Sequence, residues 1–377
     1  MNCLKTLHFN KVYSPAAKCF GLFLLFFLSF KLHSQNSLLS VESRIKSIVQ
    51  DKVDSVVRVK ATRVASIGGK VKRLLKMGSG FFISKEGHVL TTGLLPNADR
   101  IWIEHAESCL LSEEVGHDPM CNLSLLKLLE PPPSIKYIRI NEVSNNLESG
   151  SFLVGITCAL EFQIGPTLGL LQSHEFSFGK RLFPTKMLRS SLALGPGEVG
   201  APVFDLKGRF IGITHAALPD LKSSFLLPAS ACKRIRDDLI LSGEVLYGWF
   251  GITTTRKLNE SNSFDIVING FVEDSPAKKS NLSKGDILLQ VGKTLIKSQG
   301  DLANSSFFAE PDTILEFKVR RDNKDLIFPV QVTARPKILQ KPKFMNDSLE
   351  SKTVNNEVNG SQSLGIAADE KNASINF

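Results

Sequence analysis

The sequence predicts a mainly β protein, with a large β-barrel or sandwich unit followed by a smaller β unit. Short β-type runs punctuated by glycine and proline recur up to about residue 230, a spacing typical of barrels and sandwiches. Long helical periodicity occurs once, at residues 229–241, where a domain would end. A chain of 377 residues has room for two or three domains and an ample core.

The elements follow in order along the chain. A short amphipathic stretch at residues 41–49 leads into an alternating strand at 56–59. In the second unit, Asp274-Ser275-Pro276-Ala277 predicts a helix start, with a cap residue ahead of a proline in the first turn. Beyond Pro336 the chain is rich in Asn, Ser, Lys and Glu, which predicts a disordered tail over 337–377. The other predicted strands are 80–83, 101–103, 152–155 and 210–213 in the large unit, and 264–271, 287–291 and 315–319 in the small one.

The N-terminus has the layout of a secretory signal peptide. Lys5, Lys11 and Lys18 precede an apolar run at residues 19–30, and a small-residue cleavage signal ends at Ser34. The run is 12 residues long, whereas a transmembrane helix needs about 20. We therefore expect residues 1–34 to direct a secreted or periplasmic location, with an uncleaved membrane anchor as the weaker alternative.

The charge distribution argues against nucleic-acid binding. Without residues 1–34 the formal charge falls from +9 to +5, which is mild, and the basic residues are dispersed rather than striped. No cofactor is expected.

The cysteines leave two interpretations open. In an exported protein, Cys109, Cys121, Cys158 and Cys232 allow one or two disulfides, with no pairing assigned by sequence. His105 with Cys109, and His117 with Cys121, also repeat a spacing of zinc-ligand types. Because residues four apart on a strand are separated by about 13 Å, a metal site is not favoured.

Four segments keep the order and register of a known protease family. They are a Gly-Ser-Gly strand with its turn, an aspartate-bearing segment, a glycine-rich strand and a glycine loop with its exit hairpin. In this chain they lie at residues 78–91, 118–128, 165–171 and 195–213. On these segments, residues 41–336 resemble the HtrA (Deg) family of trypsin-like serine proteases with C-terminal PDZ domains. The resemblance implies a chymotrypsin/trypsin-like double β-barrel over 41–243 and a PDZ domain, a small β-barrel or sandwich with two helices, over 247–336.

The departures from the family pattern fall on the catalytic triad. Residues 91–96 of this chain correspond to the family's Thr-Asn-Asn-His-Val-Val. Leu94 therefore stands at the position of the general base. Asn122 replaces the aspartate, and Val199 takes the place of the nucleophilic serine in the loop 197–202. Acyl transfer needs a nucleophile, a base and a carboxylate, and none of these three side chains supplies its group. Catalytic residues are therefore expected to be absent.

The backbone of the loop could keep its hydrogen-bond donors although the catalytic side chains are absent. The N–H groups of Gly197, Glu198 and Val199 would form the residual oxyanion loop, leaving a peptide-binding cleft without hydrolysis. We expect Glu198 to be a solvated loop residue. The rival interpretation is rescue of catalysis by other residues, for which the candidates are His215, Ser190, Ser191 and Glu198.

A second motif points to binding of peptide C-termini. Trp249-Phe250-Gly251-Ile252 resembles the loop with which PDZ domains grip a carboxylate through consecutive backbone N–H groups. The segments 275–277 and 281–288 follow at the distance that the family signature requires.

The sequence thus favours an exported pseudoprotease that binds exposed C-terminal or extended peptide segments, in a regulatory, scaffold or chaperone-like role in protein quality control. The alternative is an active endopeptidase with non-standard catalytic residues. A third hypothesis is a scaffold subunit in a mixed oligomer, since the resemblance implies trimers and contact with an active relative.

Overall fold

The computed structural model describes residues 39–67, 70–140, 147–179, 181–336 and 375–376, so the predicted signal peptide lies outside the described residues. Residues 39–52 are helical, and the short helix η1 (Val53–Ser55) follows. The chain divides into two compact units, residues 1–51 and 52–377, and each is considered by itself. Within the described ranges, no helix is both long and apolar enough to cross a membrane.

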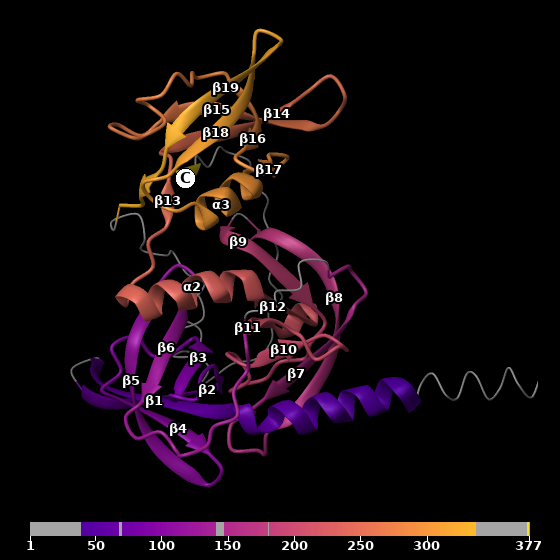
Figure 1. Cartoon of the computed structure of the whole chain (residues 1–377), viewed down its shortest axis with the longest axis vertical. Helices are drawn as coiled ribbons and strands as arrows, with labels where there is room; N and C mark the ends of the chain where they lie inside the picture. Colours follow the sequence, from indigo (N-terminus) through magenta and orange to yellow (C-terminus); the bar gives the residue numbers. More distant parts are fainter. Residues whose placement is uncertain (1–38, 68–69, 141–146, 180, 337–374, 377) are drawn as a thin grey trace, which may run out of the picture. The chain divides into compact units, whose positions relative to one another are not determined.

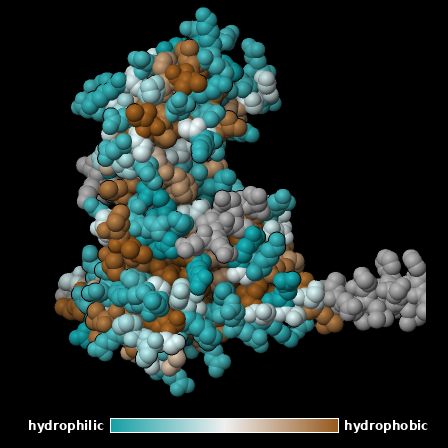
Figure 2. Space-filling view, viewed as in Figure 1, coloured by the Kyte–Doolittle hydropathy of each residue, from teal (hydrophilic) through white to brown (hydrophobic). Residues whose placement is uncertain are grey.

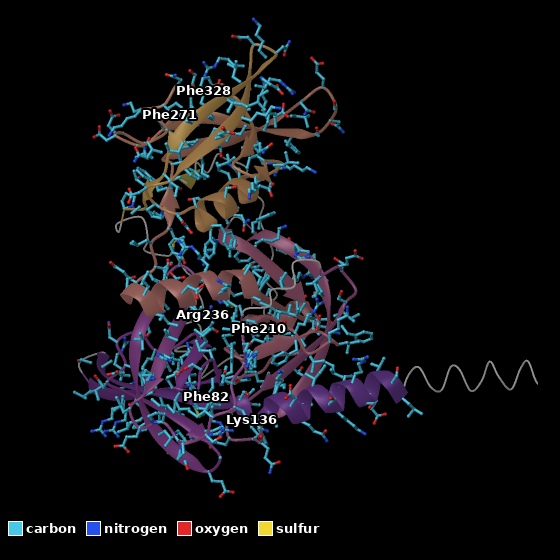
Figure 3. The ribbon with its side chains drawn as sticks, viewed as in Figure 1. Phe82, Lys136, Phe210, Arg236, Phe271 and Phe328 are labelled. Atoms are coloured by element: carbon cyan, nitrogen blue, oxygen red, sulfur yellow. The ribbon has the colours of Figure 1, made fainter. Side chains whose placement is uncertain are left out.

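The first barrel of the larger unit is a closed, six-stranded antiparallel sheet in the order β1-β2-β3-β6-β5-β4 (Figure 1). Its core holds alternate apolar side chains of these strands, including Val57, Val59 and Phe82, of which Figure 3 labels Phe82. The predicted strands at 56–59, 80–83 and 101–103 are confirmed. The strands are β1 (Val56–Ile67), β2 (Lys70–Phe82), β3 (His88–Thr92), β4 (Arg100–His105), β5 (Ser108–Asp118) and β6 (Leu123–Leu128).

The second barrel closes in the order β10-β11-β12-β9-β8-β7. Leu153, Val203 and Leu226 are fully buried in its core, and Phe210 stacks against Phe81 of the first barrel with ring centroids 5.4 Å apart. The predicted strands at 152–155 and 210–213 and the helix at 229–241 are confirmed. The elements are β7 (Phe152–Thr157), β8 (Gly165–Phe178), β9 (Arg181–Ser190), β10 (Pro202–Phe204), β11 (Phe210–Leu218), η2 (Pro219–Leu221), β12 (Ser223–Pro228) and α2 (Ala229–Ser242).

The C-terminal domain is built on one antiparallel sheet in the order β19-β18-β16-β15-β14-β21, with β17 beside β16 and a separate β13–β20 pair. Phe250 and Phe317 meet edge to face at 5.0 Å in its core, against which Phe271 and Phe328 pack (Figure 3). Its elements are β13 (Gly248–Trp249), β14 (Ile252–Leu258), β15 (Phe264–Phe271), β16 (Ile287–Val291), β17 (Thr294–Leu295), α3 (Gln299–Phe308), β18 (Ile314–Arg321), β19 (Lys324–Gln331), β20 (Thr333–Ala334) and β21 (Ile375–Asn376).

The helices of this domain differ from the prediction. The segment after Asp274 forms turns rather than a helix, although the Ser275 hydroxyl accepts from the Lys278 N–H, as a cap residue would. The helix lies instead at α3, where Ser298 and Asp301 form a reciprocal capping box. Two helices were expected, and one is found among the described residues of this domain.

The disulfides that the sequence allowed are not formed, and most of the predicted tail is not described. Cys109, Cys121, Cys158 and Cys232 are free thiols, and all but the first are buried. No three His, Cys, Asp or Glu side chains converge as metal ligands in the described part of the chain. Of the tail predicted over 337–377, only Ile375 and Asn376 are described, and they form β21; the rest of the predicted tail lies outside the described residues.

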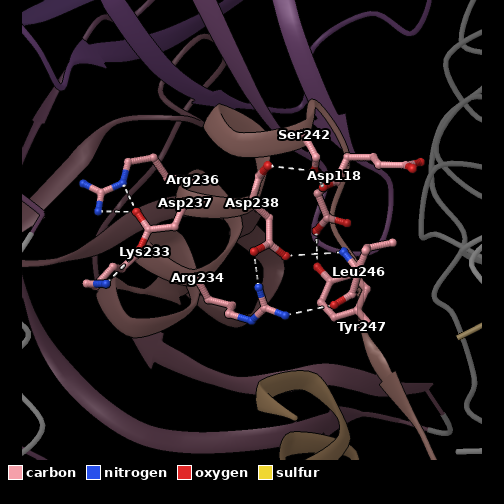
Figure 4. A network of polar contacts seen from close by, with 10 residues as sticks. Asp118, Lys233, Arg234, Arg236, Asp237, Asp238, Ser242, Leu246 and Tyr247 are labelled. Atoms are coloured by element: carbon pink, nitrogen blue, oxygen red, sulfur yellow. Dashed lines mark hydrogen bonds and ion pairs between the residues drawn. The ribbon is translucent and has the colours of Figure 1, made fainter. Parts of the chain in front are cut away.

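A buried acid ties the barrels to the segment that enters the C-terminal domain (Figure 4). Asp118, at the end of β5, is fully buried and accepts from the Tyr247 hydroxyl at 2.7 Å and from the Cys121 N–H at 2.9 Å. The Tyr247 ring also lies 5.0 Å from the Phe307 ring of α3. From α2, Arg234 pairs with Asp238 and donates to the Leu246 carbonyl at 2.9 Å. The linker that enters the C-terminal domain is thus held by Asp118 of the first barrel and by Arg234 of α2.

Tyr247→Phe should destabilise the protein by about 1–3 kcal/mol, because it leaves a buried carboxyl group short of a donor. Burial raises the pKa of Asp118, while the Tyr247 hydrogen bond acts in the opposite direction. Removing that hydroxyl raises this pKa further. Stability of the variant should therefore fall relative to the parent as pH rises above the ordinary range of an aspartate, and the difference should shrink in acid. Urea unfolding at several pH values measures this.

The matched control for this experiment is Tyr137→Phe, which removes a hydroxyl from a side chain that is 37% exposed. It should leave the unfolding midpoint unchanged. Equal effects of the two variants at every pH would contradict the role given to Asp118.

Candidate functional site

The loop at residues 195–201 is hydrogen-bonded to the first barrel through Ser79 of β2. The Ser79 N–H donates to the Val199 carbonyl at 2.9 Å, and the Ser79 hydroxyl donates to the Gly197 carbonyl at 2.9 Å. The same hydroxyl accepts from the Cys158 N–H at 2.9 Å. One small side chain therefore joins both barrels to the loop. The sequence contained a signal for it in the Gly-Ser-Gly motif, but no role could be assigned there.

Thr214 of β11 holds the same loop from the second barrel. Its hydroxyl donates to the Glu198 carbonyl at 2.7 Å and accepts from the Ala201 N–H at 2.8 Å. Its carbonyl accepts from the Gly200 N–H at 2.8 Å and from the Thr92 hydroxyl, on the first barrel, at 3.0 Å. The sequence analysis missed Thr92 and Thr214, because their partners are far away along the chain.

The segments that carry the three predicted triad positions meet at this junction. The Gly93 N–H donates to the Asn122 carbonyl at 3.2 Å, and a Cβ atom placed on Gly93 would lie 3.6 Å from Val199 Cγ1. Leu94 is 7% exposed and belongs to the apolar core of the first barrel, with Phe82. These side chains contain no nucleophilic oxygen or sulfur atom and no group that can take its proton.

The residual oxyanion loop has a constrained backbone. Gly197 has φ +87°, and a Cβ atom there would lie 2.6 Å from the Leu160 nitrogen. Within the described residues, neither the Gly197 N–H nor the Val199 N–H has a hydrogen-bond acceptor, whereas the Glu198 N–H donates to the Gly195 carbonyl at 3.3 Å. Two backbone donors are therefore left for an oxygen atom of a bound peptide.

Glu198 is not the solvated residue that the sequence predicted. Its side chain is half-buried, and Oε1 accepts from the Thr157 hydroxyl at 2.6 Å. The other oxygen, Oε2, accepts from the Gly195 N–H. The carboxylate thus holds the loop together, and the prediction failed because Thr157 lies 41 residues away in sequence.

The other proposed rescue residues also make structural contacts or lack a catalytic partner. Buried Ser190 bonds to the Ser224 hydroxyl at 2.6 Å, and the Ser191 hydroxyl accepts from the Leu170 N–H at 2.9 Å. Burial lowers the pKa of His215 to about 4, so its ring is neutral at physiological pH. Its buried Nδ1 atom has no partner among the described residues. None of these groups forms a nucleophile–base pair.

A thiol beside the loop does not replace the missing serine. Cys158 is fully buried and its N–H is bonded to Ser79. Burial raises the pKa of Cys158 to about 11, which leaves very little of the nucleophilic thiolate near neutral pH.

Two serine–histidine hydrogen bonds occur in the first barrel. Ser124 bonds to His117 Nδ1 at 2.9 Å, but it is fully buried and donates to the Glu114 carboxylate. Ser84 bonds to His88 Nδ1 at 2.8 Å where β2 turns into β3, away from the loop segments described above.

The loop at residues 249–252 has the geometry that a carboxylate-binding backbone needs. Gly251 has φ +72°, and a Cβ atom on it would lie 2.1 Å from Ser275 Cβ, so only glycine fits. Its carbonyl accepts from the Val272 N–H at 2.8 Å. Trp249, Phe250 and Ile252 are buried side chains, so the loop offers its backbone and not these side chains to a ligand.

The strand that follows, β14, faces α3. Gln299 at the start of α3 donates through Nε2 to the Thr254 carbonyl at 2.9 Å and to its hydroxyl oxygen at 3.2 Å. One edge of β14 pairs with β15, and the other pairs over Thr253 and Thr254 with the two-residue strand β21. A peptide lying between a strand edge and a helix is the arrangement of β-strand addition.

Comparison with known proteins agrees with this architecture. Residues 78–213 match the trypsin-like peptidase domain, and residues 248–332 match the PDZ domain. The chain thus joins a trypsin-like peptidase domain to a PDZ domain, the combination that the HtrA resemblance implied. The predicted fold class is confirmed, and the loop at residues 249–252 lies at the start of the PDZ match.

Curated relatives are similar over most of this chain. A probable periplasmic serine endoprotease DegP-like from Pseudomonas fulva is 28% identical over 284 residues, which cover 71% of this chain and 58% of the relative. A protein of the same description from Chlamydia trachomatis is 25% identical, covering 78% and 60%. The chain therefore spans about three fifths of the length of these relatives.

Solved structures share the fold. An HtrA-type protease AlgW with a decapeptide has a TM-score of 0.63 at 21% identity, covering 78% of this chain and 99% of that one. The serine endoprotease from Yersinia pestis has a TM-score of 0.57 at 20% identity, covering 78% and 98%.

Gly200→Ala should destabilise the protein by about 3 kcal/mol or more, which is near the upper end for single substitutions. Gly200 has φ +93°, and its added Cβ would lie 2.2 Å from the Ser79 carbonyl. The matched control is Gly150→Ala, at φ +91° with nothing within 4 Å, which should cost only the left-handed backbone penalty of about 1–2 kcal/mol. Chemical denaturation of both variants tests the difference, and equal losses would show that close packing at the junction is unimportant.

Proposed function

We propose that this protein is an exported HtrA-like pseudoprotease that binds peptide segments and does not hydrolyse them. The single observation behind this proposal is Val199. It stands at the position of the nucleophile, and its aliphatic side chain cannot attack a carbonyl carbon. Leu94 and Asn122 support it, since they stand where the resemblance expects the base and its carboxylate. Loss of the nucleophile or base alone typically costs about 10⁶ in turnover.

The retained function in this proposal is peptide binding by the PDZ domain. Gly251 keeps a backbone that can donate to a carboxylate, and β14 offers a strand edge beside α3. Two kinds of AlgW structure, one with a decapeptide and one with a tripeptide, show that proteins of this fold are found with short peptides. The ligand class that fits is therefore an exposed C-terminal or extended segment of a protein.

The proposed location is the periplasm or the extracellular space, in a regulatory, scaffold or chaperone-like role. It rests on the apolar N-terminal run and on relatives described as periplasmic. Assembly as a homotrimer, or with an active relative, belongs to the same proposal.

The alternative is an active serine-type endopeptidase with non-standard residues, favoured by the endoprotease description of the relatives and by the two remaining oxyanion donors. It requires a nucleophile–base pair that the described residues of the junction do not form.

The purified chain should neither cleave unfolded casein nor react with a fluorophosphonate probe, since both need an activated nucleophile. Trypsin serves as the positive control in the same buffer. Turnover that disappears in His215→Ala or Glu198→Gln would instead establish the endopeptidase and identify the replacement residue.

Gly251→Ala should abolish or weaken by at least about tenfold the binding of fluorescent C-terminal peptides, because the new Cβ collides with Ser275. Gly285→Ala is the matched control, since Gly285 has φ +98° in the same domain and nothing lies within 4 Å of its added Cβ. Fluorescence anisotropy measures binding, and circular dichroism checks folding. Unchanged binding by Gly251→Ala would exclude this loop as the carboxylate site.

A further inference from the structure

The strand edge assigned to peptide ligands is paired with a segment of the chain itself. β21 (Ile375–Asn376) lies antiparallel to β14, with Thr253 opposite Asn376 and Thr254 opposite Ile375. The other edge of β14 pairs with β15, so β21 takes the position of an added strand at the end of the sheet. An exposed edge strand is a ready template for such pairing.

The direction of β21 is the one that a C-terminal peptide would need. Along β14 the chain runs from the Gly251 loop through Thr253 to Thr254, so Asn376 lies nearer the loop than Ile375 does. The segment therefore approaches the loop with its carboxyl side. A peptide that places a carboxylate on the backbone N–H groups of this loop, while adding a strand to β14, must run in the same sense.

The position of α3 and the length of chain between Pro336 and β21 both agree with this placement. Gln299 of α3 bonds to Thr254, the residue opposite Ile375, so the paired segment lies at the strand edge that α3 flanks. Between Pro336 and β21 there are 38 residues, enough to span up to about 130 Å. Chain length therefore does not prevent the return of the segment to its own domain.

We propose that the segment Ile375–Asn376 is an intramolecular ligand that occupies the peptide-binding edge of β14, so that external peptides must displace it. This inference rests on the proposed peptide-binding function of the PDZ domain. A tethered segment competes at the effective concentration set by its tether, which raises the apparent dissociation constant for every external peptide. If the segment occupies the edge nine-tenths of the time, external affinity is lowered about tenfold.

The test compares the full chain with Ile375→Pro, which fixes φ at this residue and removes one of the two N–H groups of β21. The control is Ala367→Pro, outside the paired segment. A fluorescent peptide copying residues 368–377 is titrated against all three proteins. We expect Ile375→Pro to bind it about tenfold more tightly than the full chain, and Ala367→Pro to match the full chain. Equal affinities for all three overturn the intramolecular ligand and leave peptide binding intact.

Hydrogen exchange of residues 252–258 without added peptide gives a second, independent measurement. We expect faster exchange in Ile375→Pro than in the full chain and in Ala367→Pro, at a rate that does not change on dilution. If no protein binds the peptide but this difference in exchange is present, the self-contact stands and the proposed peptide-binding function fails. Exchange that is equal in all three proteins overturns the self-contact. If the protection of residues 252–258 from exchange is lost on dilution, the segment paired with β14 belongs to a second copy of the chain. This result also overturns the intramolecular ligand.

Discussion

The structure of the barrel pair depends on the hydrogen bonds that hold the loop at residues 195–201 between Ser79 and Thr214. Each of these residues uses both its backbone and its hydroxyl group, so the loop is bonded to both barrels at once. The Gly200 position leaves no space for a side chain against the Ser79 carbonyl. Because the contacts involve backbone atoms of the loop, they do not depend on the side chain of Val199. This explains how the loop keeps its shape with valine at position 199.

The connection to the PDZ domain is similarly constrained. Tyr247 contacts Asp118 of the first barrel with its hydroxyl and Phe307 of α3 with its ring. On the second barrel, the Thr185 hydroxyl donates to Asn304 of α3 at 2.7 Å. The same helix carries Gln299 beside the peptide-binding edge. A ligand on β14 thus lies along a helix that also contacts Tyr247 of the linker and β9 of the second barrel.

Local patterns predicted a mainly β protein and the positions of many of its strands, whereas the double barrel and the PDZ domain were predicted from the resemblance to the HtrA family. Local patterns failed where the hydrogen-bond partner of a residue is distant in sequence. Glu198 looked solvated because its partner Thr157 is on another strand, and composition gave no sign that Ile375 and Asn376 pair with β14. The missed helix α3 has weak apolar periodicity, yet its capping residues Ser298 and Asp301 were visible in the sequence.

The pairing of β21 has a consequence for the behaviour of the protein in concentrated solution. Without it, the PDZ sheet would end in β14, an edge with the β-branched residues Ile252, Thr253 and Thr254 that could associate with other chains. The opposite edge strand, β19, contains Pro329 and the charged pair Lys324-Asp325, features that discourage such association. Occupation of β14 by the chain's own segment therefore also protects against aggregation, and a bound client peptide would take over that protection when it displaces the segment.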